Sequence, residues 1–193
     1  MNRLDASQAR DHIEMVDRIL AESHQRLCSG GEFFLVWGIG SAAVTAIFTL
    51  VNTGVLPGQA AWWTAVVLAA CVIFSVLRGK QTRRLLARSS LVQREFFNVL
   101  WITLGSAFIV DAAAFRIFAG LASAAIWSVA EAIVLLYIGM HGNRRAQIAG
   151  VAVIASLIAA NFLAAPLAGY VLAAGMLLGY GGFGASELLA NDE

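Results

Sequence analysis

The chain has 193 residues, of which 60% are hydrophobic and only 13% are charged. A soluble domain is usually about 45–50% apolar and about 25% charged, so this composition excludes an ordinary water-facing globular surface. The formal net charge is only +1, but the placement of the charges along the chain is informative.

The first 31 residues are polar, with no cleavable signal peptide pattern, and residues 5–27 are predicted to form an amphipathic cytoplasmic helix. Asp5 can cap this helix, with Gln8 three residues further on. Apolar and small side chains recur at heptad positions, so one stripe of the helix must be covered. Its candidate contact residues are Ile13, Val16, Leu20 and Leu27. The helix either packs on the protein's own inner loops or the membrane surface, or docks a second copy or a cytoplasmic protein partner.

Six apolar runs follow the polar segment. A helix that crosses a ~30 Å hydrocarbon layer needs about 20 apolar residues, and the runs do not alternate as the strands of a barrel would. The sequence therefore predicts an all-α membrane protein with a transmembrane domain over 32–187 and a cytoplasmic tail over 188–193. The predicted transmembrane helices span residues 33–52, 61–77, 97–119, 122–140, 147–165 and 167–185.

The orientation follows from the 13 lysines and arginines. All except Arg116 lie before the first span, between spans two and three, or between spans four and five. Basic residues favour the cytoplasmic side of a membrane, so both termini are predicted to be cytoplasmic. The basic segment 78–94 is either only a determinant of this topology or also a contact for lipid headgroups. Its candidate headgroup contacts are Arg83, Arg84 and Arg88.

An internal repeat organises the spans. Glu32-Phe33-Phe34 opens span one as Glu95-Phe96-Phe97 opens span three, and Trp63-Thr64 in span two matches Trp127-Ser128 in span four. A shorter third hairpin resembles the first two. Each repeat contains an even number of spans, so the copies are predicted to be parallel. The expected architecture is three tandem hairpins.

Four polar residues in the predicted spans are candidates for an intramembrane site. Asp111 and Glu131 lie about ten residues before and after the turn between spans three and four, or ~15 Å below the outer surface. Two carboxyl groups at one depth would not both ionise, so they could bind a cation, pass a proton, or form a neutral clip between helices. Arg116 is expected to extend to the outer interface, and Asn161 to hold two helices together.

Several other patterns do not support a catalytic or metal site. Gly179-Tyr180-Gly181-Gly182-Phe183-Gly184 fits G-x-G-x-x-G, but it ends a membrane helix where a nucleotide site needs a strand–turn–helix. Gly175 and Gly179 form a G-x-x-x-G pair, which indicates close packing within the molecule or, alternatively, a dimer face. The three histidines lack metal-ligand spacing. We expect no cofactor, no metal and no nucleic-acid partner.

The N-terminal polar helix, followed by Gly30-Gly31-Glu32-Phe33-Phe34-Leu35-Val36-Trp37-Gly38, resembles an uncharacterised family of bacterial proteins with six transmembrane helices. The resemblance implies a multi-pass protein of the bacterial cytoplasmic (inner) membrane and carries over no functional residues. The favoured interpretation is a non-enzymatic protein of structural or regulatory type that uses residues 5–27 as its contact face. The alternative is a transporter of a small solute, ion or proton that uses Asp111 and Glu131. A membrane enzyme with an unrecognised site is the third.

Overall fold

The computed structural model describes residues 13–16, 30–85, 91–113 and 120–191, and these residues contain helices and turns but no strand. The all-helical prediction is therefore confirmed for the described part of the chain. The elements are α2 (Gly31–Asn52), η1 (Gly58–Ala61), α3 (Trp62–Leu85), α4 (Leu91–Ala113), α5 (Leu121–Met140), α6 (Arg144–Ala160), α7 (Ala165–Met176), η3 (Leu177–Gly181) and α8 (Gly182–Asn191).

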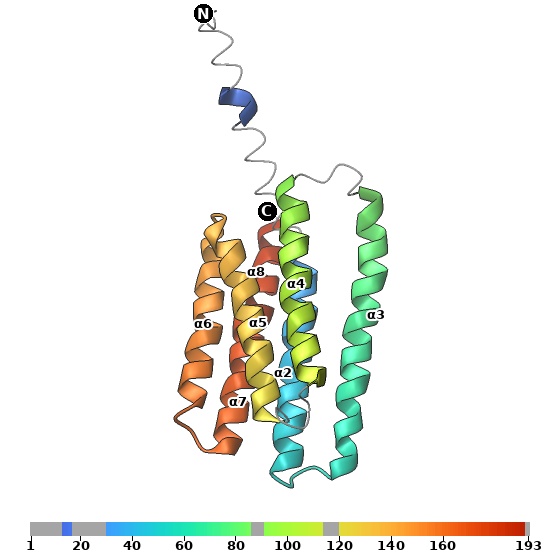
Figure 1. The fold of residues 1–193 in the computed structure, drawn as a ribbon, viewed down its shortest axis with the longest axis vertical. Coiled ribbons are helices and arrows are strands. Elements are labelled where there is room, and N and C mark those ends of the chain that lie inside the picture. The colour runs from blue at the N-terminus through green and yellow to red at the C-terminus, as the bar shows by residue number, and fades with distance from the viewer. Residues whose placement is uncertain (1–12, 17–29, 86–90, 114–119, 192–193) are drawn as a thin grey trace, which may run out of the picture.

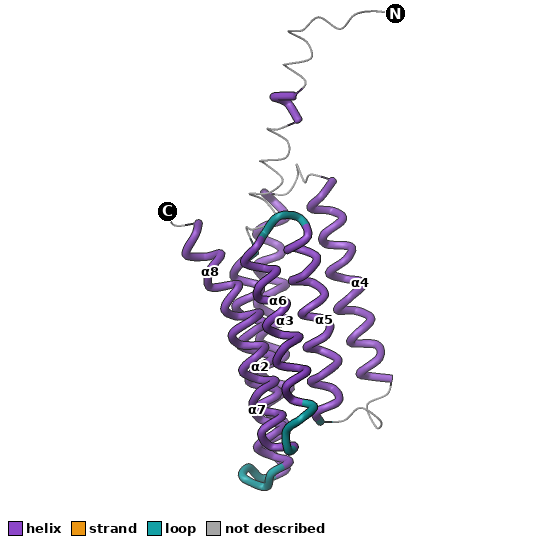
Figure 2. Tube along the Cα trace, turned by 90° about the vertical axis from the view of Figure 1, so that its left-hand side faces the viewer, coloured by secondary structure: helices purple, strands orange, loops and turns teal. Residues whose placement is uncertain are grey.

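The long helices run side by side along the longest axis of the molecule (Figures 1 and 2). Helices α2, α5, α6 and the continuous α7–η3–α8 segment form the packed centre, in which α5 lies against α6 and α2 lies against α7 and α8. Helix α3 packs on α2, and α4 packs on α5. Helices α3 and α4 are therefore flanking helices, and each packs on a different central helix.

Four helical segments in the described ranges are long and apolar enough to cross a membrane, namely Gly31–Asn52, Gly58–Lys80, Leu121–Met140 and Ala165–Ala190. The flanking helices expose large apolar side chains such as Trp63, Ile73, Trp101 and Ile109. Contiguous exposed apolar surface of this kind is rare on a soluble monomer. Helix length and surface together suggest a membrane location.

The observed helix bounds differ from the predicted spans at several ends. Helix α3 continues to Leu85 instead of ending at 77, so its last residues belong to the basic segment 78–94. Helix α6 begins earlier, at Arg144, because the Asn143 side chain accepts a hydrogen bond from the Ala146 amide and caps it. It also ends earlier than the predicted 165, at Ala160. The predicted tail at 188–193 is helical as far as Asn191.

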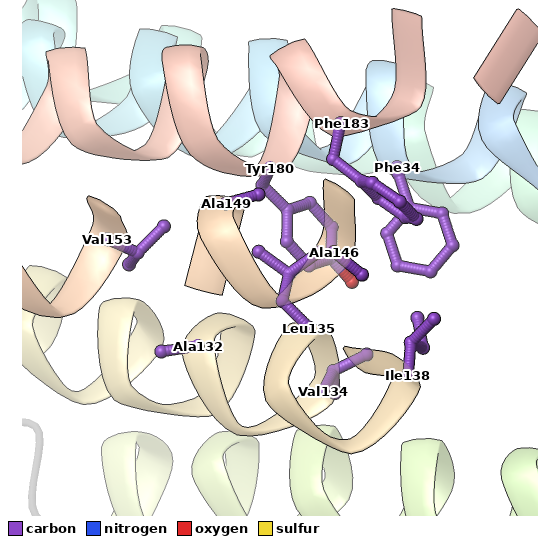
Figure 3. Packing of buried hydrophobic residues seen from close by; sticks show 10 residues of the cluster. All are labelled: Phe34, Ala132, Val134, Leu135, Ile138, Ala146, Ala149, Val153, Tyr180 and Phe183. Atoms are coloured by element: carbon purple, nitrogen blue, oxygen red, sulfur yellow. The ribbon is translucent and has the colours of Figure 1, made fainter. Parts of the chain in front are cut away.

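The main core lies between α2, α5, α6 and the last helical segment. Its buried residues are Phe34, Ala132, Val134, Leu135, Ile138, Ala146, Ala149, Val153, Tyr180 and Phe183. Figure 3 shows the rings of Phe34, Tyr180 and Phe183 gathered above the α5 and α6 residues. The Phe34 ring centroid lies 5.0 Å from each of the other two centroids, a separation typical of favourable aromatic pairs.

The glycine-rich last segment is explained by close helix packing. A Cβ added to Gly38 of α2 would lie 2.2 Å from the Gly181 backbone nitrogen, and one added to Gly184 would lie 2.3 Å from the Leu35 nitrogen. The π-helical turn η3 occurs at this crossing. Gly175 and Gly179 face Ser156 and Val153 of α6, so the G-x-x-x-G pair packs within the molecule, as one of the two interpretations predicted.

Candidate functional site

A cavity of about 460 Å³ lies between the two central helices α2 and α5 and the two flanking helices α3 and α4. This volume is within the ~300–1,000 Å³ range of small-molecule sites. The cavity extends from Trp37 to Asn52 along α2 and includes Gly58 and Gly120, so it reaches the end of the bundle where α2 turns towards α3. Its polar lining residues are Ser41, Thr45, Thr49, Asn52, Thr64, Asp111 and Ser123.

Asp111 is the acid of this cavity. It lies on α4, and its Oδ2 accepts a hydrogen bond of 3.1 Å from the Trp127 indole Nε1 of α5. Its Oδ1 is buried and has no hydrogen-bond partner among the described residues. None of the described residues that line the cavity is a lysine or an arginine. The protein therefore holds this carboxyl group at the cavity by one neutral donor.

Glu131 has a different environment. It lies on α5, one turn beyond Trp127, and is 2% exposed. Ser41 hydrogen-bonds its carboxyl group, and Tyr180 of η3 is close enough to interact with it electrostatically. The Oε2 atom has no hydrogen-bond partner among the described residues. Glu131 does not line the cavity, whereas Ser41 does, so Ser41 lies between the buried acid and the cavity.

The sequence predicted Asp111 and Glu131 as a pair, and the structure gives them separate partners. Asp111 accepts a hydrogen bond from Trp127, whereas Glu131 is hydrogen-bonded to Ser41 and interacts electrostatically with Tyr180. Residue counting estimates the depth of a side chain but does not determine the direction in which it points around its helix. The two acids therefore lie on neighbouring helices and hydrogen-bond different side chains.

The opposite half of the α2–α3 pair is closed by direct contacts. The Trp37 indole donates a 2.9 Å hydrogen bond to Ser75 of α3, and Phe33 packs edge-to-face on Phe74 with centroids 6.1 Å apart. At the end where α2 begins, Glu32 and Arg78 form a bidentate ion pair. These contacts hold α3 against α2 from Trp37, at one end of the cavity, to the beginning of α2.

The other predicted site residues lie elsewhere. Asn161 is the C-cap residue of α6 and its side chain is exposed, so the structure does not place it in a contact between helices. Ile13 and Val16 are helical and exposed. Arg83 and Arg84 lie on α3. Arg88, Arg116, Leu20 and Leu27 fall outside the described residues.

Comparison with known families, curated proteins and solved structures gives no match. Across residues 13–16, 30–85, 91–113 and 120–191, no group of three or more histidine, cysteine or acidic side chains is placed to hold a metal ion.

The sequence did not reveal the role of Trp127 or Ser41. Trp127 was predicted only as the repeat match of Trp63, yet its indole donates a hydrogen bond to Asp111 of α4. The signal that could have identified it is its spacing of four residues from Glu131, which puts both on one face of α5. No comparable signal marks Ser41, because a serine on an apolar helix usually bonds its own backbone.

Proposed function

We propose that the protein is a carrier that binds a small solute in the cavity between α2, α3, α4 and α5, with Asp111 as the principal polar contact. The observation that supports this most is the carboxyl group itself, which has one unpartnered oxygen and belongs to the lining of a mainly apolar cavity within apolar helices. An ionisable residue at such a position is expensive and is commonly functional. A purely structural clip would bury both oxygens against donors.

The topology that we propose for this carrier has six spans, with α4 and α6 crossing the membrane beside the four longer helical segments. Both termini would be on the cytoplasmic side of a bacterial inner membrane, in three tandem hairpins. Support comes from the arginines of the chain and from Figure 1, in which α2 begins and α8 ends at the same end of the bundle. The cavity would then face the outer side.

A carrier must open its site to each side in turn, and helix α3 is suited to that movement. It packs on α2 at its inner half through the Trp37–Ser75 and Glu32–Arg78 contacts, while its outer half borders the cavity. In this proposal the structure corresponds to a state closed at the inner end. Breaking the Glu32–Arg78 pair would accompany inward opening.

The test is the accessibility of cysteines to a charged, membrane-impermeant thiol reagent, measured in right-side-out vesicles. The background protein carries Cys28→Ser and Cys71→Ser. Ser123→Cys places a thiol in the cavity lining, and Ser156→Cys is the matched control because Ser156 is also a half-buried serine but packs against Gly175. We expect the cysteine at 123 to react at least about tenfold faster, as a water-filled site would require. Equal rates at the two positions would refute the carrier cavity.

A second candidate function is docking of a cytoplasmic protein or a second copy through residues 5–27. The observation that favours it is that Ile13, Met15 and Val16 are all more than half exposed, with fractions of 63%, 60% and 54%. Deleting residues 1–28 tests it, with partners identified by co-purification from the native membrane. Loss of a partner supports docking, and an unaltered set of partners contradicts it.

A further inference from the structure

The chemistry of the cavity lining restricts which solute it can hold. Starting from the proposed function, on which this step depends, we infer that the ligand is a singly charged organic cation, such as an amine or a quaternary ammonium ion with short alkyl groups.

The charge of the ligand follows from Asp111. Its Oδ1 has no partner, its Oδ2 has only the neutral Trp127 donor, and the described lining offers no basic side chain. An ionised carboxylate among apolar helices needs a positive partner. An anion would be repelled by the carboxylate and would find no positive charge in the described lining. Because Asp111 is the single acid of that lining, it balances one positive charge.

The aromatic side chains of the cavity point to an organic cation. The aromatic lining residues are Trp37, Phe48, Trp62, Phe108 and Trp127. Faces of tryptophan and phenylalanine attract ammonium groups, and sites for quaternary ammonium ligands commonly use such rings. The same rings contact alkyl groups well. A site with one acid and five aromatic side chains therefore matches a cation that carries apolar substituents.

The volume of the cavity and the oxygen ligands that its lining offers argue against a bare metal ion. At ~30 Å³ per water molecule, a space of about 460 Å³ corresponds to about 15 waters, which is far larger than an ion. Calcium takes six to eight oxygen ligands, commonly with several carboxylates, and magnesium requires a near-ideal octahedron. The described lining has one carboxyl group, and its other side-chain oxygens belong to neutral serine, threonine and asparagine residues. An organic cation fills the space that an inorganic ion would leave to water.

The test is equilibrium binding of radiolabelled tetraethylammonium to the purified full-length protein in lipid nanodiscs. This probe cannot lose a proton, so its charge is fixed. We expect saturable binding, weakened at least about tenfold by Asp111→Asn, because a charge-assisted contact is lost, and largely restored by Asp111→Glu. Glu187→Gln is the matched control. Glu187 is also a buried acid, but it bonds Asn143 at the other end of the bundle, and its substitution should leave binding unchanged.

A second arm uses the unmodified protein and does not depend on the folding of a variant. Unlabelled tetraethylammonium should displace the label, whereas 3-ethyl-3-pentanol, a neutral molecule with similar branched alkyl groups, should displace none. Displacement by the neutral alcohol, or undiminished binding to Asp111→Asn, would overturn the inference of a cation. Either result would still be compatible with a cavity that binds a neutral solute. The cysteine-labelling experiment tests separately whether the cavity is accessible at all.

Discussion

Replacing Gly38 by alanine tests the helix crossing that positions the core beside the cavity. The added Cβ would lie 2.2 Å from the Gly181 nitrogen and 2.5 Å from the Gly181 Cα, whereas ordinary contacts begin at 3.4 Å. The shortfall at the nitrogen is therefore 1.2 Å. Both atoms belong to the backbone of η3, so no side chain can rotate away, and α2 and η3 must separate.

Overpacking of this kind costs about 1–3 kcal/mol, which corresponds to a fall in melting temperature of roughly 2–12 °C for a chain of this size. The matched control is Gly105→Ala on α4, where the new Cβ would have no neighbour within 4 Å. That substitution should be neutral or slightly stabilising, because alanine favours helix over glycine by about 0.5–1 kcal/mol. The assay is thermal unfolding in detergent, followed by size-exclusion chromatography. If Gly38→Ala melts at or above Gly105→Ala, the crossing of α2 and η3 is wrong.

Three further substitutions test the contacts around the site. Trp127→Phe removes the hydrogen-bond donor to Asp111 while keeping an aromatic ring, so tetraethylammonium binding should weaken by up to about tenfold. Trp37→Phe removes a donor to Ser75 instead and should have the smaller effect. The reverse order of the two effects in a binding titration would contradict the proposed role of Asp111. Glu131→Gln should melt close to the parent protein, because a buried carboxyl group without a cationic partner is neutral and the amide is neutral and of similar size. A large loss of stability would show that an ionised Glu131 is needed. Glu32→Gln should cost little stability, and only at low salt, since the Glu32–Arg78 pair is partly exposed. A large, salt-independent loss on thermal unfolding would contradict this.

The helical class and the approximate positions of the helices follow from the sequence because long apolar runs leave few alternatives. Boundaries are harder, since they depend on local events such as the Asn143 cap at the start of α6. The π-helical turn at Leu177–Gly181 leaves no distinct pattern in a glycine-rich run. This turn lies where Gly38, which is far away in the sequence, comes close to the Gly181 backbone.

Asp111 shows how far the sequence can define the candidate site. The cost of an acid in an apolar helix singles it out, and its depth can be estimated by counting. Its partner could not be predicted, because a rotation of α4 or α5 by one residue, about 100°, would turn the side chains in other directions. The cavity depends on the separation of α3 from α4, which results from α3 packing on α2 and α4 packing on α5.

The helix packing also shows how residues at matching positions of the predicted repeat can differ in environment. Trp127 is half-buried and donates its indole hydrogen to Asp111 of the flanking helix α4, whereas Trp63, its predicted counterpart, is 63% exposed. The central helix is the first of the α2–α3 hairpin but the second of the α4–α5 hairpin. Residues at matching repeat positions therefore meet different neighbours.

The most direct test of whether Asp111 binds a cationic solute in this cavity combines cysteine labelling with tetraethylammonium binding. The quantity measured is the rate of thiol labelling. Tetraethylammonium is added during labelling of the protein with Ser123→Cys, with or without Asp111→Asn. We expect the ammonium ion to slow labelling when Asp111 is present and to have no effect when asparagine replaces it. If the ion leaves the labelling rate of the Asp111 protein unchanged, Asp111 does not bind a cation in this cavity.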